Sequence, residues 1–391
     1  MSIIEDGKQY LMKTYARTPV VFDKGEGVYL YDEDGNKYLD FVGGIAVNSL
    51  GYNNEGLNEV ITNQTKKLMH VSNLYYTKPN VELAKKMVEK SKLDRAFFCN
   101  SGAEATEGAM KLARMYADKF KNKETKIIAM NNSFHGRTFG AVTATGQLKY
   151  QEHLGPILPD VVHIDFNDFE AVKKEAKDNC CGIIVEPIQG EGGIRPAKKE
   201  YLEKLRKLCD DLDIVLIFDE VQCGIGRTGH LFAYEYFDVV PDVVCMAKGI
   251  AGGLPMGAIL AKEEKAKAFE PGNHASTFGG NAVCSAAASY VIDKMESVTS
   301  NVKKQGIYLK EKLEELKEKY DCIIDVRGAG LMLGMEFNKP VSDIIGNAFK
   351  DKLLLLNSGT NIIRFVPPLI IDEKDIDKCI LILDKAIKET M

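Results

Sequence analysis

A single lysine stands out as a candidate nucleophile because of the residues around it. Lys248 is the only charged residue between Val243 and Ala261, in the stretch DVVCMAKGIAGGLPMGAILA. A lysine held among apolar residues loses hydration, and its pKa falls from about 10.4 toward a value at which the free amine exists. A neutral amine can attack a carbonyl and form a Schiff base. A lysine that extends from a loop into solvent is the alternative, and this segment alone favours that alternative.

A carboxylate at the end of another apolar run is a possible partner for Lys248. In IVLIFDEVQCGIGRTG, Asp219 and Glu220 follow a predicted strand, and ligands bind at the carboxyl ends of strands in open α/β sheets. One interpretation is the magnesium-holding strand of a P-loop NTPase, but the chain contains no Gly-Lys-Ser or Gly-Lys-Thr. The other is a buried carboxylate that keeps a heterocyclic nitrogen protonated. Alone, such an aspartate is as often a helix cap or an ion-pair partner.

A third element is suited to binding phosphate. The run AFFCNSGAEATEGAMKLARMYA predicts a strand, a turn and a helix, with Ser101 as N-cap and Glu104 in a capping-box position. Free N–H groups at a helix start attract anions, and Gly102 permits close approach to the backbone. Ser101 acting only as a helix cap is a substantial alternative. A phosphate seat, a carboxylate at a strand end and a shielded lysine together are the equipment needed for pyridoxal 5'-phosphate.

The segment between Arg95 and Ala261 must position these groups. It alternates short, nearly continuous apolar runs with amphipathic ones, which indicates a mainly parallel sheet covered by helices on both faces. The predicted strands are 96–99, 126–130, 182–185, 214–218, 243–246 and 257–260, and the predicted helices are 103–119, 168–177 and 198–212.

The two ends of the chain have a different pattern. Residues 1–50 form an N-terminal arm with two strand patterns joined at Asp34-Gly35, a good hairpin turn. We expect this arm to join a small α+β domain at residues 298–391, with a larger domain at 51–297 between them. Predicted elements outside the larger sheet are helices at 57–68, 301–320 and 374–389, strands at 323–327 and 331–337, and a hairpin-like pair at 353–357 and 362–365.

Composition excludes several classes of protein. The 391 residues carry a net charge of -5 with scattered basic residues, so no nucleic-acid partner is expected. Nine cysteines without a C-x-x-C pair suggest a reducing, intracellular compartment and no metal site. The start of the chain lacks a signal-peptide core. The longest apolar stretch, Val243 to Ala261, contains four glycines, Pro255 and Lys248, so we expect no membrane span.

Several motifs extend this interpretation to a known family. From about Tyr15 to the C-terminus the chain resembles the fold-type I, class-III aminotransferases, and within them most closely the acetylornithine aminotransferases. The motifs are NSGAEA, FHGRTFGAVTATGQ, EPIQGEGG, FDEVQCGIGRTG, AKGIAGGLPMGA, STFGGN, RGAGLMLGMEF and RFVPPLII. The resemblance implies a large domain with a mainly parallel, seven-stranded sheet, a smaller α+β domain, and a homodimer with shared active sites.

The resemblance also assigns the residues that would hold pyridoxal phosphate. Lys248 would carry the cofactor and act as general base, and Asp219 would pair with the protonated pyridine nitrogen. Glu186 resembles a family residue that contacts the cofactor-binding residues and not the cofactor itself. Further cofactor contacts are implied for Ser101 and Gly102 at the phosphate, Phe134 on the ring face, Glu220, Val221 and Gln222 beside Asp219, and Thr277 of the partner subunit.

Transamination alternates an amino donor with 2-oxoglutarate or glutamate, and all of them carry carboxylates that arginine binds bidentately. By resemblance, Arg137 binds the donor's α-carboxylate and the side-chain carboxylate of glutamate. Arg364 binds the α-carboxylate of glutamate, and Glu191 pairs with Arg364 when the other substrate is present. For each of these residues in isolation, a surface ion pair is the commoner explanation. Weaker expectations of substrate or phosphate contact fall on Tyr15, Ser276 and Asn281.

The expected donor is N-acetylornithine, used in arginine biosynthesis in the cytoplasm. Ornithine aminotransferases carry a tyrosine near the position of Gly44 and Ile45, and a smaller residue leaves room for an acyl group. Ornithine, 4-aminobutyrate and N-succinyldiaminopimelate are the nearest rival donors, and a non-catalytic cofactor-binding protein is a remote alternative. Two departures from the family are expected not to touch the chemistry. One is the segment Gly51-Tyr52-Asn53-Asn54, where a His-rich run is common, and the other is the pair Thr106 and Gly108, where Asn and Ala are common.

Overall fold

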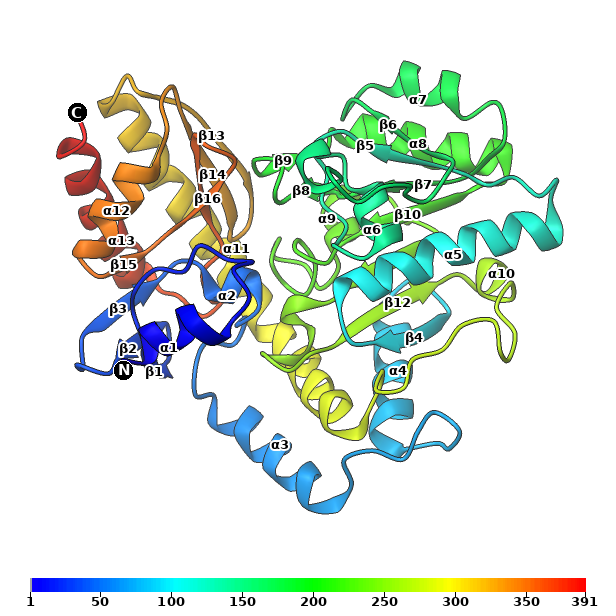
Figure 1. The fold of residues 1–391 in the computed structure, drawn as a ribbon, viewed down its shortest axis with the longest axis horizontal. Coiled ribbons are helices and arrows are strands. Elements are labelled where there is room, and N and C mark those ends of the chain that lie inside the picture. The colour runs from blue at the N-terminus through cyan, green and yellow to red at the C-terminus, as the bar shows by residue number, and fades with distance from the viewer. Residues whose placement is uncertain (1) are drawn as a thin grey trace.

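A seven-stranded sheet forms the centre of the larger lobe of the computed structural model, which describes residues 2–391 (Figure 1). The strand order is β4-β12-β11-β10-β7-β5-β6, and β12 alone within this sheet runs against both its neighbours. The mainly parallel α/β sheet predicted from the sequence is confirmed. Its strands are β4 (Arg95–Cys99), β5 (Lys126–Met130), β6 (Val161–Ile164), β7 (Cys180–Val185), β10 (Val215–Asp219), β11 (Val243–Met246) and β12 (Gly257–Ala261).

The central strands are apolar along their whole length because both faces of the sheet are covered. Successive side chains of a strand point to opposite faces. Ile217 and Cys245 accordingly belong to the core under α5 (Gly102–Phe120), and Phe218 and Val244 belong to the core that includes the apolar side of α8 (Lys199–Leu212). Six of the seven strands were predicted. The edge strand β6 was not, because its four residues are only partly buried and its apolar run is short.

The predicted helices that flank the sheet are confirmed, with ends shifted by a few residues. They are α5, α7 (Phe169–Glu175) and α8. Helix α3 (Glu55–Lys67), which was predicted outside the sheet, is also present, and the helices α4 (Lys78–Lys90), α6 (Phe139–Ala144), α9 (Ala233–Phe237) and α10 (Glu263–Ala266) were not predicted. Small residues of α5 allow close packing: a Cβ on Gly108 would lie 2.6 Å from Ile259 Cδ1. Glycine at this position therefore serves the contact between α5 and β12.

One long helix connects the two lobes. Helix α11 (Ala282–Lys319) has 38 residues and begins at Ala282, so the prediction of a start at residue 301 is wrong. The first half, AVCSAAASYVIDKM, is largely buried and so lacks the charged face that marks the second half. Asn281 caps the helix by accepting a hydrogen bond from the N–H of Cys284 at 3.0 Å. The domain boundary expected at residue 298 falls inside this continuous helix.

The smaller lobe combines the two ends of the chain. The N-terminal strands β1 (Phe22–Glu26), β2 (Tyr29–Asp32) and β3 (Lys37–Asp40) form an antiparallel sheet, which β15 (Leu353–Leu354) extends by pairing parallel to β3. In Figure 1 the blue arm lies beside the orange and red C-terminal elements, and both termini lie in this lobe. The remaining elements are α1 (Ile3–Tyr10), β13 (Ile323–Ala329), β14 (Met332–Phe337), α12 (Ser342–Lys350), β16 (Leu356–Ser358), β17 (Ile362–Phe365) and α13 (Glu373–Lys388).

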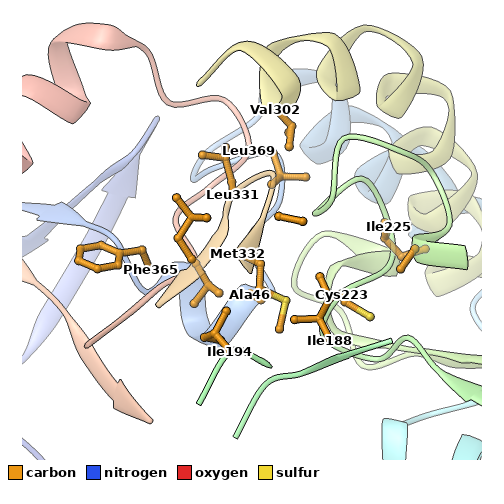
Figure 2. Close-up of a cluster of buried hydrophobic side chains, with 14 of the residues drawn as sticks. Ala46, Ile188, Ile194, Cys223, Ile225, Val302, Leu331, Met332, Phe365 and Leu369 are labelled. Carbon is orange, nitrogen blue, oxygen red and sulfur yellow. The ribbon is translucent and has the colours of Figure 1, made fainter. Parts of the chain in front are cut away.

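Apolar side chains from both lobes share one core. Ile188 and Cys223 of the larger lobe lie near Met332 of the smaller one, and Val302 of α11 lies near Leu369 in the same cluster (Figure 2). Buried hydrophobic residues therefore form part of the contact between the lobes. All nine cysteines are buried and unpaired, and within residues 2–391 no helix is long and apolar enough to cross a membrane.

Candidate active site

A cavity of about 650 Å³ opens where the central strands end. Lys248 follows β11, Asp219 ends β10, and Ser101 and Gly102 start α5 after β4, so the three elements singled out in the sequence meet in one place. The separate signals are thus parts of one site. Its other lining residues are Val47, Asn100, Ala103, Phe134, His135, Gly136, Arg137, Glu186, Glu191, Val221, Gln222, Ala247, Gly253, Leu254, Pro255 and Met256.

Lys248 starts a short 3-10 turn, η2 (Lys248–Ala251), directly after β11. Its φ of 48° lies in the left-handed region, which redirects the chain at the end of the strand. Loss of hydration lowers the pKa of the Lys248 ammonium, an effect that the nearby Glu191 and Asp219 carboxylates oppose and Arg364 reinforces. The lowered pKa favours the neutral amine that attack on a carbonyl requires.

Asp219 has a partner that the sequence analysis missed. The Nδ1 atom of His135 lies 2.7 Å from Asp219 Oδ2, and the N–H of Val221 donates to Oδ1 at 3.0 Å. Burial alone would lower the pKa of His135, but the hydrogen bond and the charge of Asp219 outweigh it and raise the pKa. His135 Nε2 is buried without a partner among the described residues. The raised pKa of His135 favours its charged form, which places a positive charge beside the Asp219 carboxylate.

Glu186 lies behind this pair. Its carboxylate accepts hydrogen bonds from the N–H groups of Phe134 at 3.0 Å and Gly190 at 3.1 Å. Burial raises the pKa of Glu186 to about 7, and the positive charge of His135 opposes the shift. Glu186 therefore fixes the backbone of two loops, one bearing Phe134 and the other leading to Glu191.

The start of α5 has the geometry of an anion site. Ser101 Oγ accepts from the N–H of Glu104 at 3.2 Å, as the capping box predicts, while the Glu104 carboxylate reaches back to the N–H of Asn100 at 2.6 Å. The first two N–H groups of the helix, on Gly102 and Ala103, have no intrahelical partner. A Cβ on Gly102 would lie 2.7 Å from Val221 Cγ1, so glycine keeps the helix close to the cavity floor.

Glu220 is turned away from the cavity. Its carboxylate accepts from the N–H groups of Ala233 at 2.6 Å and Tyr234 at 2.7 Å, which satisfies the start of α9. Burial raises the pKa of Glu220 to about 8. Adjacent residues at the end of a strand point to opposite sides, and Asp219 takes the side of the cavity, so the Glu220 side chain supports α9 and the expected cofactor contact of Glu220 stays a prediction.

Arg364 is covered by Glu191. Its Nη1 atom donates to Glu191 Oε1 at 2.5 Å and to Gln222 Oε1 at 3.1 Å, so the ion pair implied by the family resemblance is present. Arg364 is 2 % exposed and lies outside the cavity lining, whereas Glu191 and Gln222 both line the cavity. Burial alone would raise the pKa of Glu191, but the charge of Arg364 outweighs this effect and lowers the pKa. The lowered pKa favours the ionised carboxylate in the pair.

Arg137 is held differently. It is exposed, and its guanidinium carbon lies 3.7 Å from the centre of the Tyr150 ring. Tyr150 in turn packs edge-to-face on Phe134 at 5.9 Å. Glu107 Oε1 fixes the loop by accepting from Thr138 Oγ1 and from the N–H groups of Gly140 and Ala141, which start α6 (Phe139–Ala144). The cation is therefore presented to the cavity without an acidic partner among the described residues.

Thr106, one of the departures from the family, contacts the backbone of a residue of the site. The residue is fully buried, and its hydroxyl donates to the carbonyl of His135 at 2.7 Å. The N–H of His135 donates to Thr145 Oγ1 at 2.9 Å. Two threonines thus fix the backbone of the histidine that supports Asp219.

Several predicted residues do not line the cavity of this chain. Ser276 Oγ accepts from Asn100 Nδ2 at 3.1 Å, next to the start of α5, and Thr277 beside it is exposed. Asn281 is accounted for as the cap of α11. Tyr15 is 74 % exposed and lies in a separate groove with Ile3 and Leu11, so the structure does not bring it to Lys248.

The turn around Gly44 lies close to the cavity, because the residue that follows the turn lines it. Gly43, Gly44, Ile45 and Ala46 have φ values of 56°, 64°, 64° and 63°, a left-handed turn that is strained at the β-branched Ile45. Asp40 holds the turn by accepting from the N–H groups of Val42 and Gly43. Val47, which follows the turn, lines the cavity, while Gly44 and Ile45 do not.

Metal chemistry has no candidate ligand set here. Among residues 2–391, no group of three or more His, Cys, Asp or Glu side chains is placed to hold a metal ion. The carboxylates at the end of β10 are instead bonded to His135 and to the start of α9. The arrangement favours a ligand that carries both a phosphate and a ring nitrogen.

Comparison with known proteins identifies a family that matches nearly the whole chain. The sequence profile of the aminotransferase class-III family matches residues 10–387. An acetylornithine aminotransferase of Clostridium acetobutylicum is 51 % identical over 97 % of this chain and 100 % of its own length. An acetylornithine aminotransferase of Methanocaldococcus jannaschii is 47 % identical over 98 % of this chain and 97 % of the relative.

Solved structures share the whole fold. The ornithine aminotransferase of Toxoplasma gondii superposes with a TM-score of 0.95 at 30 % identity, covering 99 % of this chain and 95 % of that one. An N-acetylornithine aminotransferase of Stenotrophomonas maltophilia superposes with a TM-score of 0.86 at 34 % identity, covering 99 % of each chain.

Proposed function

The chain belongs to the class-III aminotransferases, and we propose that it transfers the δ-amino group of N2-acetyl-L-ornithine to 2-oxoglutarate. The products are N-acetyl-L-glutamate 5-semialdehyde and L-glutamate, and the reaction serves arginine biosynthesis in the cytoplasm. The single observation that carries the proposal is a cavity with Lys248 at its floor and two differently held arginines around it.

The residues present fit pyridoxal 5'-phosphate. The N–H groups at the start of α5, with Ser101 beside them, suit the phosphate, and the Asp219 carboxylate, at hydrogen-bond distance from His135, suits the pyridine nitrogen. Gln222, Val221 and Phe134 line the same cavity, and an aromatic side chain such as that of Phe134 can cover a flat ring. When bound, the cofactor supplies an aldehyde for the amino group and a ring that withdraws electrons.

Lys248 is the proton carrier of the proposed reaction. With its pKa lowered by loss of hydration, its Nζ can be neutral and accept the proton from the donor's amine-bearing carbon. The residues Leu254 to Met256, which follow it in the chain, give the cavity part of its apolar lining. His135, whose Nδ1 atom lies 2.7 Å from Asp219 Oδ2, holds that carboxylate in position during the transfer.

Two arginines suit two substrates that alternate in one cavity. Arg137 is uncovered and can bind a carboxylate of either substrate. Arg364 is paired with Glu191, and a second carboxylate must displace Glu191 to reach it. Glutamate has two carboxylates and acetylornithine has one, so we infer that glutamate engages both arginines and acetylornithine engages Arg137 alone.

The turn at Gly44 and Ile45, in the N-terminal arm, supports the choice of acetylornithine as donor. No bulky aromatic side chain stands in this turn, and only Val47 of the segment lines the cavity. The acetyl group of the donor adds volume and removes a charge at the α-amine. Ornithine, 4-aminobutyrate and N-succinyldiaminopimelate remain the alternatives that a direct comparison must test.

We also propose a homodimer with shared active sites. Apolar side chains gather beside the start of α5: Leu74, Tyr75, Tyr76 and Phe278 are 83 %, 69 %, 96 % and 62 % exposed. Asn73 links the two segments that carry them by donating to the carbonyls of Ser276 and Gly279. A second copy of this chain would cover these residues, and Thr277 would then contact the cofactor site of that copy. Light scattering at micromolar concentration tests this, with a monomer as the contradicting result.

A donor screen tests the function. Purified protein is supplied with pyridoxal phosphate, 2-oxoglutarate and, in turn, acetylornithine, ornithine, 4-aminobutyrate or N-succinyldiaminopimelate, and glutamate is measured. We expect acetylornithine to give the highest kcat/KM. Equal or higher turnover of a rival donor would overturn the substrate while leaving the chemistry intact. Amino transfer that is lost in Lys248→Ala excludes a non-catalytic cofactor-binding protein.

A further inference from the structure

We propose that Ser358 is a positioning residue for the Glu191–Arg364 pair and sets how easily Arg364 becomes free to bind a carboxylate. The inference rests on the proposed function, because it assumes that only one of the two substrates must displace Glu191. Ser358 does not line the cavity, so it acts through Glu191 and not on the substrate.

The hydroxyl of Ser358 reaches the loop that carries Glu191. Its Oγ atom lies 3.0 Å from the carbonyl oxygen of Gly190 and 2.9 Å from that of Glu191. Ser358 is 1 % exposed, so the two carbonyls share its single proton in a dry environment. A hydrogen bond in such a place is costly to lose, because water cannot replace the donor.

Ser358 and Arg364 belong to one rigid unit. In the antiparallel hairpin of β16 and β17, Leu356 pairs with Arg364 and Ser358 pairs with Ile362. Residues that are paired, or two apart along a strand, share a face, so the side chains of Ser358 and Arg364 project from the same face of the hairpin. The hairpin thus contacts the loop twice, through the Glu191 side chain and through the backbone at Gly190 and Glu191.

A third contact fixes the far end of the same loop. Arg327 of β13 donates from Nε to the carbonyl of Gly193 at 2.9 Å. Gly193 has a φ of 99°, and a Cβ there would lie 2.7 Å from Ile362 Cδ1, so the loop lies flat on the smaller lobe. With the backbone held at both ends, release of Arg364 requires only rotation of the Glu191 side chain, which is 25 % exposed.

Loss of the Ser358 hydroxyl would shift the balance at Arg364. The carbonyls of Gly190 and Glu191 would lose their buried donor, and the loop would move to hydrate them. The Glu191 carboxylate would then spend less time at Arg364, which already has an unpartnered Nε atom. Arg364 would bind glutamate more readily, and it would also capture the acetylornithine carboxylate in an unproductive orientation.

The test measures the two half-reactions separately in Ser358→Ala. We expect the KM for acetylornithine to rise and the KM for glutamate to fall, so that the ratio of the two kcat/KM values changes by about fivefold, the effect of one hydrogen bond. Ser358→Thr, which keeps the hydroxyl, should restore the ratio, and Glu191→Gln should shift it further in the same direction. Asn357→Ala is the control, since the side chain of that exposed neighbour donates to the carbonyl of Gly359 and, among the described residues, has no hydrogen bond to the loop.

Backbone amide exchange of residues 187–196 gives a readout independent of catalysis. Exchange should be about fivefold faster in Ser358→Ala and unchanged in Asn357→Ala. Equal losses in both half-reactions, or unchanged exchange, would overturn the proposal, since simple damage to the fold acts on both substrates alike. If the wild type transfers no amino group, the proposed function fails, and the amide exchange alone decides whether Ser358 holds the loop.

Discussion

The two arginines at the candidate active site are held in opposite ways. Arg364 is 2 % exposed, paired with Glu191 and hydrogen-bonded to Gln222, and belongs to the smaller lobe. Arg137 is exposed, lies on the ring of Tyr150 and belongs to the larger lobe. Both side chains can bind a carboxylate, but only Arg137 is ready to do so without another group moving.

The difference follows from the cost of burying a charge. An ion taken from water needs a partner, and removing one member of a buried pair costs several kcal/mol. Arg364 can therefore exchange the Glu191 carboxylate for that of a substrate, but it cannot be left alone. Arg137 keeps its hydration and needs no resident partner. A buried arginine with an internal carboxylate acts as a switch, and an exposed arginine acts as a constant anchor.

Arg364→Ala should have the largest effect and break the switch. We expect kcat/KM for glutamate to fall by about 100-fold or more, because a charged hydrogen-bonded contact is worth about 2–5 kcal/mol. The free energy of unfolding should also fall by about 3 kcal/mol, because Glu191 loses its partner. Half-reaction kinetics and urea denaturation measure the two effects. Equal losses with glutamate and acetylornithine would contradict the assignment of Arg364 to one substrate.

Arg137→Ala should weaken the use of both substrates while leaving the stability of the fold almost unchanged. We expect kcat/KM to fall by about 30-fold for both substrates, since both use this anchor, while the free energy of unfolding changes by less than about 0.5 kcal/mol, as for other exposed positions. Arg17→Ala is a matched control, because Arg17 also lies over a tyrosine ring, at 5.2 Å from the centre of Tyr15, but outside the cavity. An effect confined to one substrate would contradict the common-anchor interpretation.

Two glutamates should respond to pH in opposite ways. Arg364 lowers the pKa of Glu191, whereas burial raises the pKa of Glu186 from 4.5 to about 7. The folded protein holds a proton on Glu186 that the unfolded chain has lost, so this group's contribution to stability is present below about pH 4.5 and is lost as the pH rises through 7.

Glu186→Gln should reduce the loss of stability between pH 5 and 7 by on the order of 2 kcal/mol, at 1.36 kcal/mol for each pKa unit. Urea denaturation across this range measures the slope, and comparison of slopes removes any constant effect of the substitution. A slope equal to that of the wild type would show that Glu186 is already ionised in the folded protein at pH 5.

Tyr150→Leu should have the smallest effect. The ring lies 3.7 Å from the guanidinium of Arg137 and orients an otherwise free side chain. A cation–π contact at an exposed position is worth about 0.5–1 kcal/mol, so KM should rise by about two- to fivefold with kcat unchanged. Steady-state kinetics with both substrates measure the change. A large fall in kcat would indicate that Tyr150 acts on Phe134 and the cofactor, not on Arg137.

Much of the candidate site follows from local sequence. Lys248 and Asp219 each end a short apolar strand, and Ser101 stands where a strand gives way to a helix. Strand ends and helix caps depend on neighbours within a few residues, so their patterns are visible in a single sequence. The parallel sheet follows from the same alternation, and it brings these ends to one edge.

Other features were decided only by the tertiary structure. His135 and Asp219 are 84 residues apart, Glu191 and Arg364 are 173 apart, and Ser358 reaches Glu191 across 167. The start of α11 could not be predicted from the sequence either. Its first half is buried and therefore lacks the polar stripe that marks a surface helix.

The sequence by itself therefore determined which groups stand at strand ends and helix starts, because short-range geometry places them. The tertiary structure decided which charges are covered, which are exposed, and which buried partners hold them. Those properties depend on contacts between residues distant in the chain and on the water that the fold excludes, and no local pattern encodes either.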